Sequence, residues 1–536
     1  MISMERNITK TIISGIFLFI PLISYAQHTY LPDMHEAVTR FVASGSYNPA
    51  FITDFPLRRT SYLHANGNIG KGDFIDYNES DDTRGYGMTT ESYYCFDDKI
   101  MLYGMMSYGN DRGANMSGSA FIPNIFLPFN LVETTDTCAG DKELEVFNLQ
   151  GAIGYRINNS IRLGGNVYYQ SANYAKFKDL RHQNSKMQLK LNAGVTYDIN
   201  KLYTLGVAYQ YHRSNESLAF GVYGTTDKQY YTLIDFGAFY GRNEVYSEMG
   251  TGYTAESTPL FTETHGASLQ LQINPTTNIH WFNEFVFTKG DGIYGTGDDN
   301  DVTYSSHDVR NMMYRGKIQL MCGNDAHVIE AEASNANIKN YENNFKMSTD
   351  NNGISHIRYY GKNQVLDKDN LQASLKYTFF KDAKAYRSRY NIGMIVAYNS
   401  MKSTTSVYPF YRKQKINRWH TMLTGAYNWF VKNQVFTLAT DIYYGTGGGT
   451  MKNDGVYADV SDNQKRPDHR DDLLQKHYDY LTASRIGGRV MLGYERNILT
   501  NISVYAKGSI SPRYALNTSF KKDTYVDMDI SLGVKF

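Results

Sequence analysis

The chain has 536 residues, with 54 basic and 53 acidic side chains, a formal net charge of +1 and a mean hydropathy of −0.47. This balance argues against a nucleic-acid or strongly anionic partner, because such partners select for a concentrated positive field. Beyond the first residues no apolar run approaches the roughly 20 residues of a membrane-spanning helix, which excludes a helical membrane protein. The 46 Tyr and 45 Gly, against 3 Trp and 11 Pro, suit β-strands joined by polar turns.

The N-terminus has the three parts of a secretory signal. Arg6 and Lys10 are basic, residues 11–22 are apolar, and Ser24-Tyr25-Ala26 ends in small residues. We therefore expect residues 1–26 to be a signal peptide, cleaved after Ala26 in Sec-type export. No cysteine directly follows the apolar run, so a lipoprotein is not expected. The three cysteines, Cys95, Cys138 and Cys322, give no disulfide framework.

Residues 27–57 precede the first expected strand. Leu31 to Val42 contains apolar residues at helical spacing with a proline near its start, which predicts a short helix. We expect this segment to lie in the periplasm or inside a lumen, and a disordered tether is the alternative. The segment is too short to form the globular plug domain of a TonB-dependent receptor.

Strict two-residue alternation dominates residues 58–536. It is clearest from Tyr525 to Phe536, where apolar residues at even positions alternate with mostly polar residues at odd positions. Such a strand has one face in an apolar medium and the other in water. The same pattern recurs at 186–197, 267–274, 371–379 and 501–510. The final Phe536 resembles the C-terminal signal that barrel-assembly machinery recognises.

Short and long connections alternate along the chain. Short turns are expected near residues 96–98, 158–159, 198–200, 275–277, 323–324, 381–386, 431–433 and 496–499. Long polar loops are expected near 71–83, 111–143, 171–185, 212–264, 289–310, 334–369, 400–416, 445–483 and 511–522. This asymmetry is typical of short periplasmic turns and long extracellular loops, and predicts an all-β, antiparallel transmembrane barrel of roughly 14–18 strands, with 18 as the best estimate.

Three local motifs suggest chemistry, each with a simpler explanation. The segment from Gly290 to Asp301 concentrates Gly and Asp, so Asp291, Asp298, Asp299 and Asp301 are candidate Ca²⁺ ligands, although the same residues are common in turns. The segment from Thr446 to Thr450 is glycine-rich but lacks the lysine of a phosphate-binding loop, so we expect a mobile surface loop. The charged run from Arg466 to Asp472 is expected to be a solvated loop.

The lumen face carries the remaining chemical information. The alternation places seven charged side chains inward: Lys186, Lys190, Lys376, Arg485, Arg489, Glu495 and Lys507. They form either a charge lattice that braces a wide barrel or a channel wall with mild anion preference. No histidine lies in a local pattern with a nucleophile or base, so we expect no enzymatic activity and no catalytic residues. No cofactor is expected apart from the candidate Ca²⁺ ion.

Three segments carry a resemblance to an outer-membrane barrel family of Bacteroidota that has no established function. They are Gly70 to Phe74, Ser117 to Ile122, and Ala172 to His182. Members of that family are often encoded beside TonB-dependent receptors, so the resemblance implies a TonB-dependent receptor complex or a surface lipoprotein as a partner, beside outer-membrane lipid. The Asn48-Pro49-Ala50 element also resembles the start of fatty-acid-type outer-membrane transporters.

These features together predict an outer-membrane channel, or an accessory barrel for nutrient uptake, in which long loops capture a solute. Three alternatives remain open. A fatty-acid-type transporter of hydrophobic compounds would have an apolar lumen pocket and a lateral opening. An adhesin or structural barrel would have a plugged lumen. A loop-borne hydrolase would have a tight Asp–His or Ser–His cluster at the outer rim.

Overall fold

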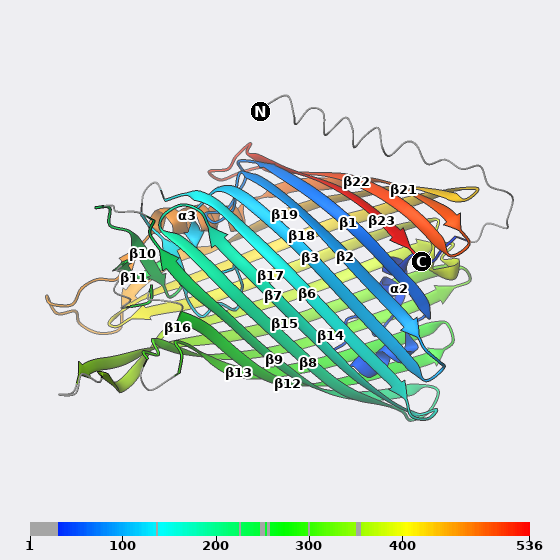
Figure 1. The fold of residues 1–536 in the computed structure, drawn as a ribbon, viewed down its shortest axis with the longest axis horizontal. Helices are drawn as coiled ribbons and strands as arrows, with labels where there is room; N and C mark the ends of the chain where they lie inside the picture. The colour runs from blue at the N-terminus through cyan, green and yellow to red at the C-terminus, as the bar shows by residue number, and fades with distance from the viewer. Residues whose placement is uncertain are drawn as a thin grey trace.

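The computed structural model describes residues 30–135, 138–223, 227–246, 252–254, 258–297, 301–349 and 355–536, and the expected signal peptide lies outside them. Eighteen strands form one closed antiparallel barrel (Figure 1). They are β1 (Arg59–Gly72), β2 (Asp82–Cys95), β3 (Ile100–Met116), β6 (Gly140–Arg156), β7 (Ile161–Lys176), β8 (Arg181–Asp198), β9 (Tyr203–Gly221), β12 (Thr258–Thr276), β13 (Ile279–Tyr294), β14 (Ser305–Cys322), β15 (Asp325–Thr349), β16 (Ser355–Lys381), β17 (Tyr390–Val407), β18 (Phe410–Val431), β19 (Gln434–Val456), β21 (Arg485–Leu499), β22 (Ile502–Ala515) and β23 (Thr524–Lys535).

Closure of the barrel joins the first strand to the last. Each barrel strand pairs with its neighbour in the chain, and β23 pairs with β1, where Leu63 lies opposite Val534. The terminal Phe536 extends this ladder, because it exchanges two backbone hydrogen bonds with Ser61. Closure leaves no free strand edge, which a sheet surrounded by lipid requires. The predicted all-β fold and the estimate of 18 strands are confirmed.

The outer face of the barrel is apolar, as the alternation predicts. In β23, Met528, Ile530 and Leu532 are exposed, and Leu375, Leu492 and many other large apolar side chains on neighbouring strands are exposed in the same way. An apolar surface of this extent is typical of a barrel immersed in lipid. None of the helices in the described ranges has the length and hydrophobicity to span a membrane.

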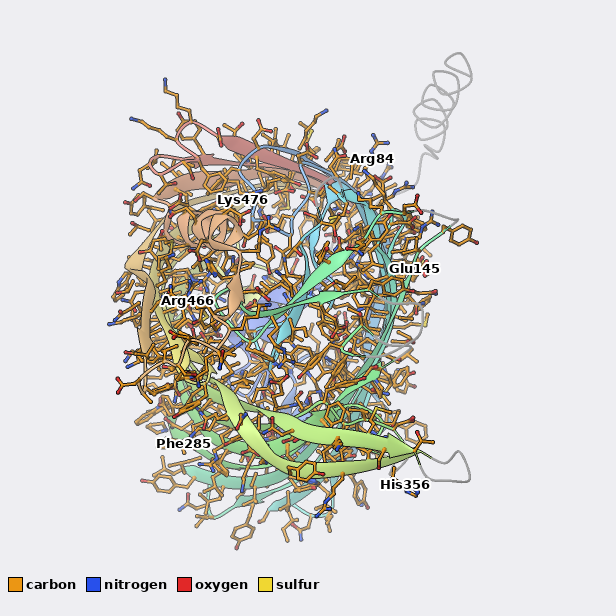
Figure 2. The ribbon with its side chains drawn as sticks, turned by 90° about the vertical axis from the view of Figure 1, so that its left-hand side faces the viewer. Arg84, Glu145, Phe285, His356, Arg466 and Lys476 are labelled. Carbon is orange, nitrogen blue, oxygen red and sulfur yellow. The ribbon has the colours of Figure 1, made fainter. Side chains whose placement is uncertain are left out.

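Short turns gather at one end of the barrel and long connections at the other. Each of the eight short turns lies between consecutive barrel strands at or within a few residues of its predicted position, but residues 496–499 belong to the end of β21 and the turn there is formed by residues 500–501. Several expected loops are strand instead: 171–185 lies mostly in β7 and β8, 334–369 mostly in β15 and β16, and 400–416 mostly in β17 and β18. Their polarity suggests loops, but these segments extend the strands, whose backbone groups pair with each other. Figure 2 shows the β15–β16 hairpin reaching outward to His356.

The expected loop from Thr446 to Thr450 is also strand, inside β19. Its glycine content has a packing reason. A Cβ at Gly447 would lie 2.9 Å from the Cα of Thr482, so glycine there lets the helix that ends at Thr482 approach the wall. The charged run from Arg466 to Asp472 is not a free loop either, since part of it joins a second sheet and part begins that helix.

Two inserts occupy the barrel. The N-terminal insert, residues 30–57, contains α2 (Met34–Arg40) and the 3₁₀ turn η1 (Pro49–Asp54), with η2 (Lys384–Tyr386) in a short turn beside it. The mouth insert is a five-stranded sheet with α3 (Asp471–Thr482), and Figure 2 shows both lying across the opening at the long-connection end. Its strands are β4 (Gly118–Ser119), β5 (Asn130–Glu133), β10 (Tyr231–Asp235), β11 (Tyr240–Val245) and β20 (Asp468–His469).

Candidate functional site: a lumen divided by two inserts

Asn48 attaches the N-terminal insert to the barrel wall. Its Nδ2 donates to the backbone oxygens of Val195 and Val207 and to Oε1 of Gln270, over 2.9–3.2 Å, and its Oδ1 accepts from Ala50 N. The wall has glycines where the insert approaches most closely. A Cβ at Gly164 would lie 2.2 Å from Ala50 N, and a Cβ at Gly194 would lie 2.2 Å from Asn48 Oδ1. The turn therefore rests in a notch that only glycines can form.

Glu284 forms a second attachment, one strand farther along the wall. Its Oε1 accepts from the Ser46 hydroxyl at 2.9 Å, from Tyr47 N at 3.0 Å and from Gln270 at 2.8 Å. Phe51 of η1 packs edge-on against Phe282 on the same strand, with ring centroids 5.2 Å apart. Polar and apolar contacts together fix η1 against β7 to β13.

The helix α2 is attached on the opposite side of the lumen. Arg40 pairs with Glu36 at 3.0 Å and donates to Ala383 O at 2.6 Å, while the second oxygen of Glu36 accepts from Ser388 N. Burial alone would raise the pKa of Asp33, at the start of this helix, but Lys535, Lys507 and Arg387 together hold it well below its ordinary value. Charged and polar groups of the wall thus hold the insert at the short-turn end.

Glu133 anchors the mouth insert. This buried β5 side chain pairs with the buried Lys142 of β6 at 3.6 Å and Lys176 of β7, and His182 of β8 lies 3.7 Å from it. On the far side, Arg412 of β18 binds Asp454 at 2.7 Å and Asp471 of α3 at 2.9 Å. Ion pairs at both ends hold the mouth sheet in the opening, and breaking one partner of such a buried pair is costly.

Residues from the segments 70–74, 117–122 and 172–182 contact the mouth insert. Phe74 packs against Tyr480 of α3 and Phe520. Residues 117–122 contain β4, and Ile122 N donates to Glu216 of the wall at 2.8 Å. Lys176 and His182 surround Glu133. These residues, distant in sequence, act as anchors of the mouth insert.

Cavities lie between the inserts and the wall in the described part of the chain. The central cavity, about 240 Å³, extends from Tyr47 of the N-terminal insert to Phe126, Leu127 and Pro128, with β8, β9 and β12 to β14 as its wall. The outer cavity, about 420 Å³, lies between the mouth sheet and β16 to β18. The side cavity, about 290 Å³, adjoins β15 to β19 and β21, and the inner cavity, about 370 Å³, lies beside α2. Leu127 borders both the central and the outer cavity.

The seven candidate lumen residues lie in different surroundings. Four have carboxylate or basic partners: Lys186 with Glu216 at 3.0 Å, Lys376 with Glu330 at 3.1 Å, Arg489 with Asp441 at 2.8 Å, and Glu495 with Arg387 and Lys535 at 2.9 Å. Arg485 lies between the Phe74 and Tyr480 rings and donates to backbone oxygens at the end of α3. Lys190 and Lys507 lie over the rings of Tyr168 and Tyr505, and Lys190 lines the central cavity.

The candidate Ca²⁺ ligands are only partly described. Asp298 and Asp299 lie outside the described residues. Asp291 is exposed in β13, and the exposed Asp301 accepts from the Thr296 hydroxyl at 3.2 Å. Within the described ranges no group of three or more potential ligands could hold a metal ion. The Ca²⁺ site therefore stays a prediction.

An Asp–His pair is present near the outer rim. His477 of α3 lies 2.7 Å from Asp76, and its ring packs edge-on against Tyr77. In the described part of the chain, Asp76 is the sole hydrogen-bond partner of His477, so no serine, threonine or cysteine is joined to the pair. The observed role of the pair is to attach α3 to the β1–β2 connection.

Sequence reasoning missed the residues that join separate elements. Asn48 stands in a recognised tripeptide, but its acceptors are backbone oxygens of β8 and β9, which have no sequence signature. Glu133 and Arg412 lie in segments that look like polar loops. A clue was the concentration of glycines at Gly164, Gly194 and Gly206 in three consecutive strands, since glycine inside a strand often marks a close backbone approach.

Comparison with known proteins identifies a family. The sequence model of a family of unknown function (DUF6850) matches residues 49–536. No curated protein shows detectable similarity. Among solved structures, the ferric preacinetobactin receptor BauA from Acinetobacter baumannii has 7% identity over 89% of this chain and 80% of its own, with a TM-score of 0.41. The copper transporter OprC has 8% identity over 89% of this chain and 80% of its own, with a TM-score of 0.40. A deletion mutant of the monoaromatic hydrocarbon channel TodX has 10% identity over 95% of this chain and 99% of its own, with a TM-score of 0.32. Likenesses this low do not extend the ligands of those proteins to this chain.

Proposed function

The chain belongs to this family of unknown function, and from its own geometry we propose that it is a gated transport barrel of the outer membrane. Its apolar outer band and closed sheet support the location, together with the signal peptide expected at residues 1–26. The observation that carries the proposal is the central cavity, enclosed between Tyr47 of the N-terminal insert and Phe126 to Pro128 of the mouth. A solute crossing the barrel has to pass both inserts.

The central cavity differs from the interior of a solid plug. Gln210 is buried and its Nε2 donor has no partner among the described residues, and the buried ring nitrogen Nε2 of His212 has none either. Lys190 lies directly opposite His212 in the β8–β9 register. Buried donors without partners cost free energy unless a water or ligand satisfies them. A solute that offers acceptor atoms would satisfy them here, which supports transport over a purely structural barrel.

The inserts also argue against an open diffusion pore, since ion pairs and hydrogen bonds to the wall hold both of them. Opening requires release of an insert, which a partner at either face could supply. We propose a TonB-dependent receptor complex or surface lipoprotein as that partner, as the family resemblance implies. We assign no reaction to the protein, because the Asp76–His477 pair has an anchoring role.

A reversible lock of the mouth insert tests the gate. An ideal Cβ at Gly237 lies 3.9 Å from Thr405 Cβ on β17, within the range of about 3.5–4.5 Å found in disulfides. Gly237→Cys with Thr405→Cys, in a chain whose Cys95, Cys138 and Cys322 are serine, should join the mouth to the wall. We expect brief openings in planar bilayers before oxidation, none after it, and their return with a reductant.

The single substitution Gly237→Cys in the same background is the control, because it carries the same backbone strain at the φ of +139° of Gly237, and its openings should not respond to oxidant or reductant. Openings that continue unchanged in the oxidised double variant would contradict a gate at the mouth. A barrel that never opens at any voltage, oxidised or reduced, would instead support the plugged structural alternative.

A further inference from the structure

Arg418 is a lumen arginine without a negative partner. It lies on β18 opposite Asn399 of β17, and its Nε and Nη2 both donate to Asn399 Oδ1, at 3.2 and 2.8 Å. Among the described residues no carboxylate lies within ion-pair distance of it. Arg412 on the same strand and Arg489 on β21 both have aspartate partners. Asn399 orients the guanidinium but carries no negative charge to balance it. Nη1 of Arg418 has no hydrogen-bond partner in the described part of the chain.

The outer cavity beside Arg418 is largely apolar. Leu366, Met401 and Ile416 line it from three neighbouring strands, and Phe236 and Phe239 line it from the mouth sheet. Aromatic and aliphatic walls of this kind bind the apolar body of a small molecule, and typical ligand cavities begin at roughly 300 Å³. The cavity volume of about 420 Å³ fits a compact ligand.

The other charged groups around the outer cavity make hydrogen bonds within the protein. Asp76 binds His477, and Asp235 accepts from the backbone N–H groups of Gly237 and Tyr240. Lys368 donates to Leu127 O at 3.2 Å. Ser403, in contrast, is nine-tenths buried and lines the cavity, and its hydroxyl has no partner among the described residues. The Arg418 cation and the Ser403 hydroxyl are therefore two polar groups that a ligand in this cavity could satisfy.

Arg418 stands where two cavities meet. Asn399, Arg418 and Leu481 line both the outer cavity and the side cavity, which adds the polar groups of Gln372, Ser374 and Thr446. Leu481 lies at the end of α3, which can pack closely against β19 because the strand has glycines there. The guanidinium thus lies between the apolar outer cavity and a second cavity that also contains the side chain of Arg485.

We propose that this junction binds an apolar monoanion, with its carboxylate on Arg418 and its hydrocarbon or aromatic body in the outer cavity. Its N–H groups offer a carboxylate charge-assisted hydrogen bonds, and the apolar wall opposes the second charge of a phosphate dianion, because burying an unpaired charge costs free energy. A polyhydroxylated acid would lose hydrogen bonds against the apolar wall. This proposal rests on the proposed transport function, because it names the class of solute that the outer cavity binds during transport.

Calorimetric titration of the full-length barrel in detergent tests the site, with 2-naphthoate as the probe and uncharged 2-naphthamide as its matched analogue. We expect the wild-type barrel to bind the acid at least tenfold more tightly than the amide. Arg418→Gln should weaken acid binding about 10- to 100-fold, as loss of a charge-assisted hydrogen bond implies, and leave amide binding unchanged. Arg418→Lys should restore part of the preference.

Arg489→Gln is the control, because Arg489 borders neither cavity, and it should bind both probes as the wild type does. Ile416→Trp should fill the outer cavity and abolish binding of both probes. Resistance of the barrel to unfolding in cold sodium dodecyl sulfate shows that each variant is folded. Equal binding of acid and amide, or acid binding that Arg418→Gln and Arg418→Lys leave unchanged, would overturn the proposed site. Either result would leave the mouth lock as an independent test of gating.

Discussion

Replacing Gly164 with alanine should dislodge the N-terminal insert without disturbing the barrel. The added Cβ would lie 2.2 Å from Ala50 N and 2.3 Å from Pro49 C, both backbone atoms that cannot rotate away. Ordinary contact begins at 3.4 Å, so the turn must retreat by at least 3.4 − 2.2 = 1.2 Å. A displacement of this size breaks the hydrogen bonds of Asn48, which are already 2.9–3.2 Å long.

The loss can be estimated from those bonds. Two buried N–H donors contribute about 1 kcal/mol each, and the Gln270 oxygen left without its donor adds about 1 kcal/mol, giving about 3 kcal/mol in total. A change of this size raises the population with a released insert roughly 100-fold. The remaining contacts, including Glu284 with Ser46, keep the segment tethered, so the effect should be on gating rather than on assembly.

Liposome swelling in isotonic arabinose measures the consequence. Gly164→Ala should swell liposomes clearly faster than the wild type. Gly109→Ala is the control, because a Cβ there meets nothing within 4 Å, and it should match the wild type. Identical swelling by all three proteins, with equal amounts of folded barrel, would refute the notch as the support of a closed state.

Three further predictions concern the mouth, the N-terminal charge and the candidate metal site. Glu133→Gln should destabilise the mouth insert by about 3–5 kcal/mol, because it leaves Lys142 and Lys176 buried without their carboxylate, and hydrogen exchange of β5 and β10 should show it. The pKa of Asp33 is held below its ordinary value when the insert is docked, so this contribution to docking is complete above about pH 4 and is lost as the pH falls further. Protease accessibility of residues 30–57 should rise at low pH in the wild type and change less in Asp33→Asn. If Asp291 and its neighbours bind Ca²⁺, a chelator should increase cleavage in the β13–β14 connection, and unchanged cleavage would remove that site.

The barrel could be predicted from sequence because the alternation of apolar and polar residues is visible within each single strand. Alternation in segments such as Tyr525 to Phe536 reports the lipid and water faces directly, and turns such as 323–324 divide one strand from the next. The positions at which the strands end were harder to predict from the sequence. Beyond the membrane both faces of a strand are polar, so the β15–β16 hairpin has the composition of a loop although it is fully paired.

The inserts could not be predicted because their contacts join distant segments. Glu133 meets Lys142 and Lys176 only when the connection after β3 folds back into the opening. The lumen position of Arg485 follows from alternation, but its place at the end of α3 does not. Arg418 was not singled out, because an arginine beside a tryptophan in a strand looks ordinary until its surroundings show that no carboxylate faces it.

The conductance of the full-length wild-type barrel in planar lipid bilayers tests the central claim most directly. With both inserts attached to the wall, we expect a silent baseline interrupted by rare, brief openings, and many more openings for Gly164→Ala. A steady ohmic current from the wild-type protein at low voltage would show that the inserts do not close the lumen, and would contradict the gated account.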